Sequence, residues 1–350
     1  DELYLNNGDG TFKNITDEAG LDKRFFVKGA TWIDYNNDSY PDLAITTLGN
    51  KTESFALYKN NTLQTGKVSF DEVTKEANID NYPKGLFALW SWDYNNDGNE
   101  DLFANAMGGL FANRPNSDKF QAVCLMNNGD GTFSDVTSEM GLEQTEKTMG
   151  CNFGDVNNDG FDDIYLGTGS PLFEDIIPNR LFLNKAGEKF TDITMSANMG
   201  HLQKGHGVGF GDYDNDGDQD VFIQLGGAYD GDIYQDALFQ NPGNENHSVS
   251  FLLEGTKSNK SALETKLILT IEEDGVERKI YTKVTSGSSF GGNSLRQEIG
   301  SGKAMEVKKL EVYWAGSGLN QTFYNIPVGG FYKIIEGKTE ITPILLDSTF

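Results

Sequence analysis

Short apolar runs recur along the chain in pairs, and each pair flanks an acidic stretch. The runs before the acidic stretches are GATWI (29–33), ALWSW (88–92), GCNFG (150–154) and GVGFG (207–211). The runs after them are LAI (43–45), LFA (102–104), IYL (164–166) and VFI (221–223). Apolar runs this short, bounded by turn residues, predict buried β-strands. Each acidic stretch is therefore expected to join two strands of a hairpin.

A second pattern alternates with the first and predicts two more strands in each unit. It occurs at LYLNNGDGTFKNIT (3–16), LYKNNTLQTGKVSFDEVT (57–74), CLMNNGDGTFSDVT (124–137) and LFLNKAGEKFTDIT (181–194). Asn-Gly and Asp-Gly between apolar runs are a strong hairpin signal because these residues tolerate positive φ. The acidic stretches begin 59, 62 and 57 residues apart. Four strands in about sixty residues is the size of a β-propeller blade.

The phase of the repeat leaves two arrangements open. The chain opens with the third and fourth strands of a unit, and its last unit ends with a third strand at ALFQN (237–241). Either the opening half-blade completes a late blade and closes a ring, or upstream blades lie outside this chain. A seven-blade ring would need roughly 420 residues at this period. We therefore expect this chain to be part of a longer protein.

The C-terminal part is also rich in predicted strands but lacks the repeat. LILTI (267–271), KIYTKV (279–284) and LEVYW (310–314) are β-branched or alternating, and EDG and AGSG provide turns. We predict an all-β protein with two domains. Residues 1–245 form a β-propeller of four acidic-loop repeats and an N-terminal half-blade, and residues 246–350 form a small β-sandwich beside or under it.

Composition excludes several classes of function. The formal charge of −25 over 350 residues argues against binding to nucleic acid or to an anionic membrane surface. No apolar run reaches the eighteen or so residues of a transmembrane helix. The two cysteines, Cys124 and Cys151, do not form a disulfide scaffold, and we expect two buried thiols in preference to a disulfide.

The four acidic stretches share one pattern of oxygen-bearing side chains. Numbered from the first aspartate, positions 1, 5 and 9 are aspartate in all four, position 3 is asparagine or aspartate, and position 6 is glycine in three. Alternate residues of a tight loop can surround one hard cation, and position 7 can add a backbone carbonyl. We therefore predict about four Ca²⁺ sites, one per stretch. The expected ligands are Asp34, Asn36, Asp38, Tyr40 and Asp42; Asp93, Asn95, Asp97, Asn99 and Asp101; Asp155, Asn157, Asp159, Phe161 and Asp163; and Asp212, Asp214, Asp216, Asp218 and Asp220.

The ion also explains how a fold tolerates so many like charges. Without it, several carboxylates would lie within about 6 Å of one another and the loop should loosen. The alternative is a set of solvated acidic turns, but four copies with fixed ligand positions disfavour it. Mg²⁺ is disfavoured because it keeps its waters, and zinc because no cluster of cysteine and histidine occurs.

Nothing in the sequence singles out a catalytic centre. The three histidines are His201, His206 and His247, and none has a serine or cysteine at a recognisable spacing. His206 could line the channel of a propeller, but we expect a rim residue bonded to backbone. Sugar binding needs aromatic platforms, for which Trp32, Trp90, Trp92 and Trp314 with Tyr35, Tyr94 and Tyr213 are available; we expect the strand tryptophans to lie in the core.

The acidic units resemble the FG-GAP/VCBS repeat, best at Phe153–Asp163 and Phe210–Asp220. That family builds β-propellers of integrin α chains, lectins and secreted bacterial proteins, and its aspartates bind calcium on one rim. The resemblance therefore implies calcium ligands at positions 1, 3, 5 and 9. The first loop departs from the family pattern with Ser39 in place of glycine and with Pro41 at position 8.

The C-terminal part resembles the ASPIC/UnbV domain from about Asn246 to Glu336. The resemblance rests on NHSVSFLLEGTKSNKSA (246–262), VTSGSSFGGNSLRQEIGSG (284–302) and VKKLEVYWAGSGLNQTFYNIPVGG (307–330). It departs at Glu264-Thr265, where Gly-Ala is usual, and at Trp314–Ser317. Neither family implies a defined reaction.

These observations favour a non-catalytic, calcium-binding module that is extracellular, on the cell surface or periplasmic, and that binds a protein or glycan on the propeller face. One alternative is a calcium-dependent polysaccharide lyase or hydrolase, which would need a cleft with convergent acidic and basic groups. A second alternative is a structural subunit of a larger surface assembly.

Overall fold

The computed structural model is almost entirely β-structure, with one short helix, α1 (Thr62–Thr65), among the described residues. It describes residues 2–21, 26–47, 54–80, 82, 85–106, 122–143, 147–169, 176–227, 230–285 and 290–346. The all-β fold class predicted from the sequence is confirmed. Within this part of the chain, no helix has the length and hydrophobicity needed to cross a bilayer.

Three four-stranded antiparallel sheets form the repeating part of the molecule, and we call each a blade. Blade 1 contains β3 (Val27–Ile33), β4 (Asp42–Thr47), β5 (Phe55–Asn60) and β6 (Phe70–Glu72). Blade 2 contains β7 (Leu86–Trp92), β8 (Asp101–Ala106), β9 (Val123–Asn127) and β10 (Phe133–Asp135). Blade 3 contains β11 (Thr148–Gly154), β12 (Asp163–Thr168), β13 (Arg180–Asn184) and β14 (Phe190–Asp192). The strands predicted on either side of each acidic stretch are therefore confirmed.

The repeat begins and ends with smaller sheets. Strands β1 (Tyr4–Asn6) and β2 (Phe12–Asn14) form a two-stranded sheet. Blade 4 contains three strands, β15 (Gly205–Gly211), β16 (Asp220–Leu225) and β17 (Ala237–Phe239). The predicted phase is thus confirmed, whereas β1 and β2 pair with each other and not with blade 4, so the ring-closing arrangement is not formed by these pairings.

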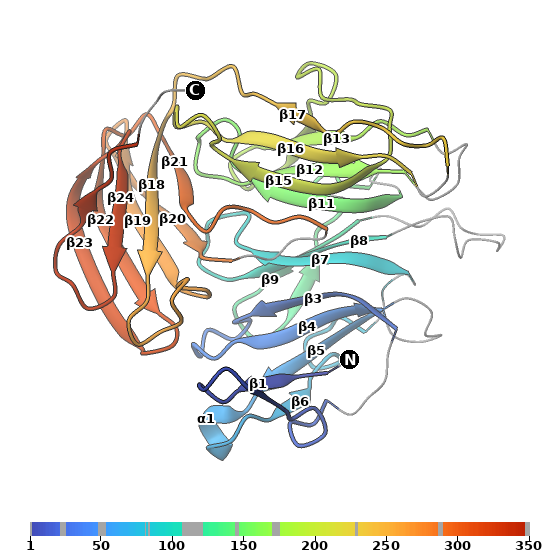
Figure 1. Cartoon of the computed structure of the whole chain (residues 1–350), viewed down its shortest axis with the longest axis vertical. Helices are drawn as coiled ribbons and strands as arrows, with labels where there is room; N and C mark the ends of the chain where they lie inside the picture. Colours follow the sequence, from blue (N-terminus) through green and yellow to red (C-terminus); the bar gives the residue numbers. More distant parts are fainter. Residues whose placement is uncertain are drawn as a thin grey trace.

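The first strands of successive blades pack against one another. β3 contacts β7, β7 contacts β11, and β11 contacts β15, and Figure 1 shows the sheets following one another from the blue to the yellow end of the sequence. Gly150 on β11 permits the closest approach, because a Cβ atom there would lie 1.2 Å from the backbone oxygen of His206 on β15. Glycine is required at this contact between blades 3 and 4.

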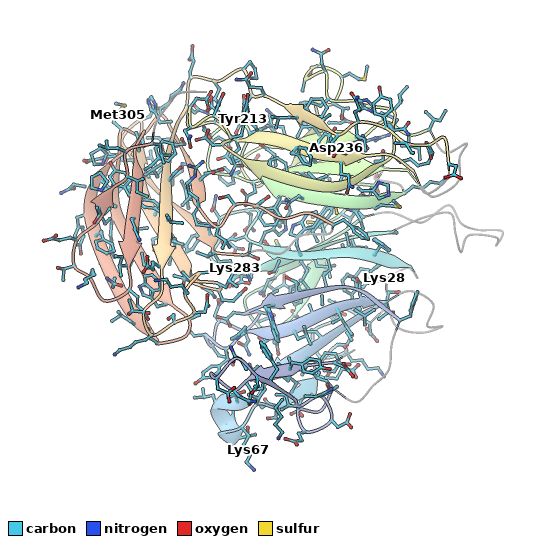
Figure 2. The ribbon with its side chains drawn as sticks, viewed as in Figure 1. Lys28, Lys67, Tyr213, Asp236, Lys283 and Met305 are labelled. Atoms are coloured by element: carbon cyan, nitrogen blue, oxygen red, sulfur yellow. The ribbon has the colours of Figure 1, made fainter. Side chains whose placement is uncertain are left out.

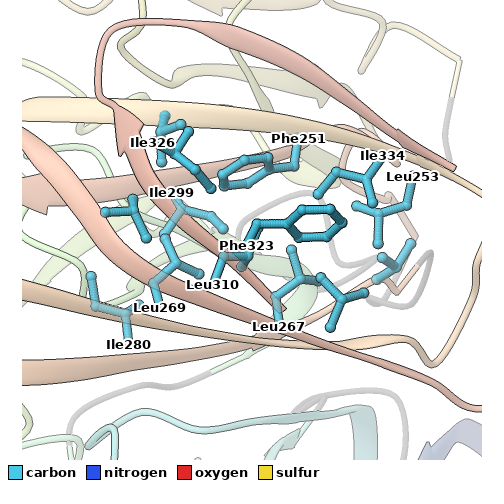
Figure 3. Packing of buried hydrophobic residues seen from close by; sticks show 14 of the residues in the cluster. Phe251, Leu253, Leu267, Leu269, Ile280, Ile299, Leu310, Phe323, Ile326 and Ile334 are labelled. Carbon is cyan, nitrogen blue, oxygen red and sulfur yellow. The ribbon is translucent and has the colours of Figure 1, made fainter. Parts of the chain in front are cut away.

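The C-terminal domain is a sandwich of two four-stranded sheets, as predicted. One sheet contains β18 (His247–Glu254), β21 (Gln297–Gly302), β24 (Phe331–Ile335) and β25 (Thr342–Pro343), and the other contains β19 (Lys266–Glu273), β20 (Val276–Lys283), β22 (Glu306–Trp314) and β23 (Leu319–Pro327). Alternating side chains of both sheets, such as Phe251, Leu269 and Leu310, meet in one buried core (Figure 3). The predicted domain boundary falls between β17 and β18.

The sandwich packs against the same end of the blades at which the acidic stretches turn. Figure 1 shows it beside the array of blades, and Figure 2 places Lys283 of β20 where the two parts meet. Each acidic stretch joins the first and second strands of its blade, so all four turn at one rim. We call this the acidic rim. Its loops therefore lie between the blades and the C-terminal domain.

Candidate metal centres

Four acidic loops form the candidate site: loop 1 (34–42), loop 2 (93–101), loop 3 (155–163) and loop 4 (212–220). In every loop the carboxylate at position 1 accepts the backbone N–H groups of positions 5 and 6. Asp34, for example, accepts hydrogen bonds of 3.0 Å from both Asp38 and Ser39. The same pairs of bonds occur at Asp93, Asp155 and Asp212. This carboxylate therefore fixes the tight turn of each loop.

The turn also requires a left-handed backbone conformation at position 4. The sequence pattern alone did not single out this position. Asn37, Asn96, Asn158 and Asn215 all have a positive φ, between 56° and 61°. Asparagine tolerates this left-handed region better than most residues, which accounts for its recurrence at position 4. Ser39 also has a positive φ of 67°, in the place where the other loops have glycine. A positive φ is unfavourable for serine, so the turn of loop 1 is strained at Ser39.

The carboxylate at position 9 closes each loop and is deeply buried. Asp42, Asp101 and Asp163 are fully buried, and Asp220 is 3% exposed. Each accepts the backbone N–H of an asparagine at the end of the third strand of its own blade, or two residues beyond it in blade 4, as Asp163 does from Asn184 at 2.7 Å. The corresponding bonds join Asp42 to Asn60, Asp101 to Asn127, and Asp220 to Asn241. The position-9 aspartate therefore links the hairpin of the first and second strands to the end of the third strand.

Burial makes the charged form of these carboxylates costly. Burial, together with the charge of neighbouring aspartates, raises the pKa of Asp42 and of Asp93 to about 7, and burial raises the pKa of Asp212 to about 6. The pKa values of Asp101 and Asp163 are well above their ordinary value for the same reasons. A nearby cation would favour the charged form, so these positions suit a metal ion.

Two buried oxygen atoms, one in loop 1 and one in loop 4, indicate that these loops could accommodate a cation. One is Oδ1 of Asp214, at position 3 of loop 4. The other is Oδ2 of Asp42, at position 9 of loop 1. Both atoms are buried and have no hydrogen-bond partner. In loop 4, Asp212, Asp214 and Asp216 each place a carboxylate oxygen within 4.8 Å of the others. An unpaired buried carboxylate oxygen is unfavourable, and a hard cation would satisfy it. The residues present therefore fit Ca²⁺.

The predicted ligand positions differ in what their side chains do. Positions 1, 3 and 5 of loop 4 bring their carboxylate oxygens together, but Asp220 at position 9 is not part of that group. In loop 1 the amide oxygen of Asn36 at position 3 accepts the backbone N–H of Asp38 at 3.1 Å. The position-7 residues Tyr40, Asn99, Phe161 and Asp218 donate their backbone N–H to the position-5 carboxylate. The side chain of Phe161 instead packs under Arg278, whose guanidinium carbon lies 5.6 Å from the ring centre. At position 7, therefore, the candidate metal ligand is the backbone carbonyl oxygen and not the side chain.

Sequence analysis did not identify the asparagines that tie each loop to its neighbour. The side-chain amide of Asn127 in blade 2 donates to the backbone oxygen of Tyr35 in loop 1 at 2.9 Å. Asn184 and Asn241 make the same bond to Tyr94 in loop 2 and Val156 in loop 3, at 2.9 and 2.8 Å. The available signal was an asparagine repeated at the end of every third strand. These bonds make the four loops one connected rim.

Cations of the C-terminal domain also contact the rim, and no sequence pattern predicted them. Lys266 Nζ lies 2.8 Å from Oδ2 of Asp34, and Arg296 Nη2 lies 3.6 Å from Oδ2 of Asp212. Nη2 of Arg278 donates to the backbone oxygen of Asp159 at 2.7 Å. The domain therefore offsets part of the negative charge of the rim.

The remaining candidates are mainly structural. Trp90, Trp92 and Trp314 are 1–3% exposed and belong to the cores, as expected, whereas Trp32 and Tyr213 are 37% and 46% exposed. Cys124 and Cys151 are both buried free thiols, as predicted. His206 lies half-buried on the first strand of blade 4, and its pKa is lowered by burial.

Comparison with known families agrees with both resemblances. Residues 93–166 match the FG-GAP-like repeat family, and residues 255–341 match the family described as ASPIC and UnbV. Cartilage acidic protein 1 of Xenopus tropicalis is 23% identical over 188 residues, which are 53% of this chain and 27% of that protein. This chain therefore spans about a quarter of the length of that relative.

Likenesses to solved structures are weak. The biofilm matrix protein Bap1 of V. cholerae has a TM-score of 0.31 and 10% identity, with 93% of this chain and 67% of that chain covered. The Photorhabdus luminescens Tc holotoxin pore has a TM-score of 0.31 and 15% identity, with 56% and 8% covered. These scores carry no argument about function. In sequence, the chain is similar to an FG-GAP-like repeat over residues 93–166 and to the ASPIC and UnbV family over residues 255–341.

Proposed function

We propose that this chain is a non-catalytic module of an extracellular or cell-surface protein, in which calcium ions hold the acidic rim and the opposite rim binds a protein or glycan. The ions would be held by positions 1, 3, 5 and 9 of each loop and by the position-7 carbonyl. Calcium supplies positive charge to a set of carboxylates that this chain buries. In this proposal the acidic loops bind calcium and catalyse no reaction.

The observation that carries the proposal is the burial of unpaired carboxylate oxygens inside repeated loops. Asp214 Oδ1 and Asp42 Oδ2 have no hydrogen-bond partner, although both are shielded from solvent. Solvated acidic turns would leave such atoms in water. Extracellular calcium sites have dissociation constants of about 10⁻⁴–10⁻³ M, which suits a surface protein more than a cytosolic one.

The opposite rim is the better candidate for ligand binding, because the C-terminal domain contacts the acidic rim. The connections between second and third strands lie there, and residues 48–53, 107–121 and 170–175 in them are outside the described residues. Several large apolar side chains near this rim are exposed: Phe26, Ile176, Leu202, Ile233 and Tyr234. Exposed apolar side chains in loops on a rigid scaffold are typical of binding surfaces.

Metal binding is tested by native mass spectrometry and thermal unfolding with calcium, magnesium or chelator. At about ten times its dissociation constant, each ion adds roughly 1.4 kcal/mol, so four ions would add about 5 kcal/mol. We expect about four bound calcium ions and a melting temperature more than ten degrees lower in chelator. A melting curve that chelator leaves unchanged would refute the structural role of calcium.

Ligand binding is tested separately with a glycan array and with immobilised extracellular proteins, in calcium-containing buffer. Binding without new reducing ends supports a binding module. New reducing ends or unsaturated products would instead favour the polysaccharide lyase or hydrolase. Replacing Ile233 and Tyr234 by serine should weaken binding while calcium binding is retained, because these residues lie on blade 4 away from the acidic loops.

A further inference from the structure

Neighbouring acidic loops hold each other through two recurring contacts. In the first contact, the side chain at position 8 of one loop accepts the backbone N–H of position 1 in the loop before it. Glu100 of loop 2 accepts this bond from Asp34 at 3.3 Å, and Gln219 of loop 4 accepts it from Asp155 at 2.7 Å. The position-1 residue of loops 1 and 3 is thus held by the following blade.

In the second contact, the asparagine at position 4 donates its side-chain amide to the next loop. Asn37 bonds to the side-chain oxygen of Asn99 at 2.9 Å, and Asn96 bonds to the backbone oxygen of Gly160 at 2.8 Å. Asn158 bonds to the backbone oxygen of Gly217 at 3.3 Å. Loops 1, 2 and 3 are therefore each hydrogen-bonded to the loop that follows.

Loop 4 has no following blade among the described residues. The C-terminal domain provides the first contact in its place, and it also bonds the position-4 asparagine, which here accepts the hydrogen bond instead of donating it. Oε2 of Glu298 accepts the backbone N–H of Asp212 at 3.0 Å, which is the role of position 8. Nη1 of Arg296 donates to Oδ1 of Asn215 at 2.9 Å, and its Nη2 donates to the backbone oxygen of Asp212 at 2.8 Å. Arg296 and Glu298 also pair with each other at 2.8 Å.

The segment that carries these residues is anchored among the first strands of three blades. The ring of Phe290 stacks on Phe87 of β7, with ring centres 5.4 Å apart. The side-chain oxygen of Asn293 accepts the backbone N–H of Phe210 in β15 at 3.1 Å, and its amide donates to the backbone oxygen of Phe153 in β11 at 2.7 Å. Figure 1 shows this segment, next to β21, reaching from the C-terminal domain toward the blades.

We propose that residues 290–298 act as a surrogate for the next blade, so that docking of the C-terminal domain orders loop 4. Glu298 replaces the position-8 residue, Arg296 replaces the partner of position 4, and Asn293 fixes both against β11 and β15. Any ligand-binding or metal-binding property of loop 4 then depends on the C-terminal domain for contacts that a following blade supplies to loops 1 to 3, although the domain also contacts those loops. This coupling requires no metal and goes beyond the proposed function.

Hydrogen–deuterium exchange of the whole chain tests this coupling, in chelator and in calcium. In Glu298→Ala, the amides of Asp216 and Gly217 in loop 4 should exchange about tenfold faster or more, whereas those of Asp97 and Gly98 in loop 2 should not change. Loop 2 is the comparator because Gln219, which holds loop 3, itself donates to Glu298 at 3.4 Å. Glu298→Gln should restore the wild-type rate, because Gln219 performs the same role at loop 3 with a neutral amide. Glu306→Gln, an exposed carboxylate of the same domain, serves as the control.

Three results would overturn the proposal. They are unchanged exchange in loop 4 of Glu298→Ala, equal acceleration in loops 2 and 4, and a Glu298→Gln variant that behaves like Glu298→Ala. If Glu298→Ala does not fold, Arg296→Ala provides the same comparison, since it removes the bonds to Asn215 and Asp212 without removing the acceptor at Glu298. Failure of calcium binding would leave the exchange comparison in chelator intact, so the two proposals fail separately.

Discussion

The ammonium nitrogen of Lys283 in the C-terminal domain lies 2.7 Å from Oε2 of Glu100 in acidic loop 2, and both side chains are buried. Lys283 also donates to the backbone oxygen of Trp32 at 3.0 Å and lies 3.2 Å from Glu264. Burial alone would lower the pKa of Lys283, but the two carboxylates raise it above its ordinary value. Lys283 is therefore a charged link between blades 1 and 2 and the sandwich.

Replacing this lysine should strongly destabilise the protein. Lys283→Met leaves Glu100 and Glu264 with less compensation in a buried site, and breaking a buried pair from one side costs about 3–5 kcal/mol. Urea unfolding measures the loss. Lys308→Met, which removes a more exposed lysine that pairs with Glu272 and Glu277, should cost less than about 1 kcal/mol. Equal effects of the two substitutions would contradict the structural role given to Lys283.

A position-9 aspartate should contribute more to stability when calcium is present than in chelator. In Asp101→Asn, the loss of one carboxylate should lower the number of bound calcium ions by one and lower the melting temperature in calcium. In chelator the variant should lose less stability than in calcium. A buried negative charge next to Asp93 and Asp97 is removed, which offsets the loss of one of the two acceptors for the backbone N–H groups of Tyr94 and Asn127.

The matched control is Asp130→Asn, which changes an exposed aspartate in the turn between β9 and β10 while keeping its side-chain acceptor for Thr132. It should leave both calcium stoichiometry and melting temperature unchanged. If Asp101→Asn bound as many calcium ions as the wild type, Asp101 would not be a ligand.

The asparagines at the ends of the third strands should contribute stability between blades. Asn184 is fully buried and donates to the backbone oxygens of Tyr94 and Asp162 at 2.9 and 3.1 Å. Asn184→Ala would leave both oxygens without this donor, at a cost of about 2–3 kcal/mol in the free energy of unfolding. Asn320→Ala, on an exposed position of β23, should change it by less than about 0.5 kcal/mol. A similar small effect at Asn184 would show that blades 2 and 3 are held together without this link.

Glu336 should give the C-terminal domain a pH-dependent stability. Oε2 of this buried residue accepts the backbone N–H groups of Thr256, Lys257 and Ser258 at 2.6, 2.6 and 2.8 Å. Burial alone would raise the pKa of Glu336, but the hydrogen bonds from Ser317 and from these N–H groups lower it below its ordinary value of 4.5. The stabilisation is therefore present above pH 4.5 and is lost as the pH falls through the lowered value.

Glu336→Gln is expected to lower the free energy of unfolding by about 2–3 kcal/mol at pH 7. The difference between variant and wild type should shrink as the pH falls well below 4.5, because the wild-type carboxylate then becomes neutral as well. Denaturant unfolding from pH 7 to pH 2 measures this difference. A difference that stays constant over that range would rule out the charged carboxylate as its source.

The sequence by itself determined the strands, their hairpins and the acidic loops. These features depend on side chains within a few residues of one another, such as the aspartates and asparagine of 155–163, and short-range turn chemistry is legible in a linear sequence. The repeat then implied the sheets, because each unit must bury its apolar strands against the next.

Only the tertiary structure decided which groups hold the loops against their surroundings. Lys266 and Asp34 are 232 residues apart in sequence, and Lys283 and Glu100 are 183 apart, yet both pairs lie within hydrogen-bond distance. No local pattern marks such pairs, because an ion pair depends on distance and burial after folding and not on separation along the chain. For the same physical reason, the pairing of Glu298 with loop 4 becomes visible only when the sandwich is packed against the blades.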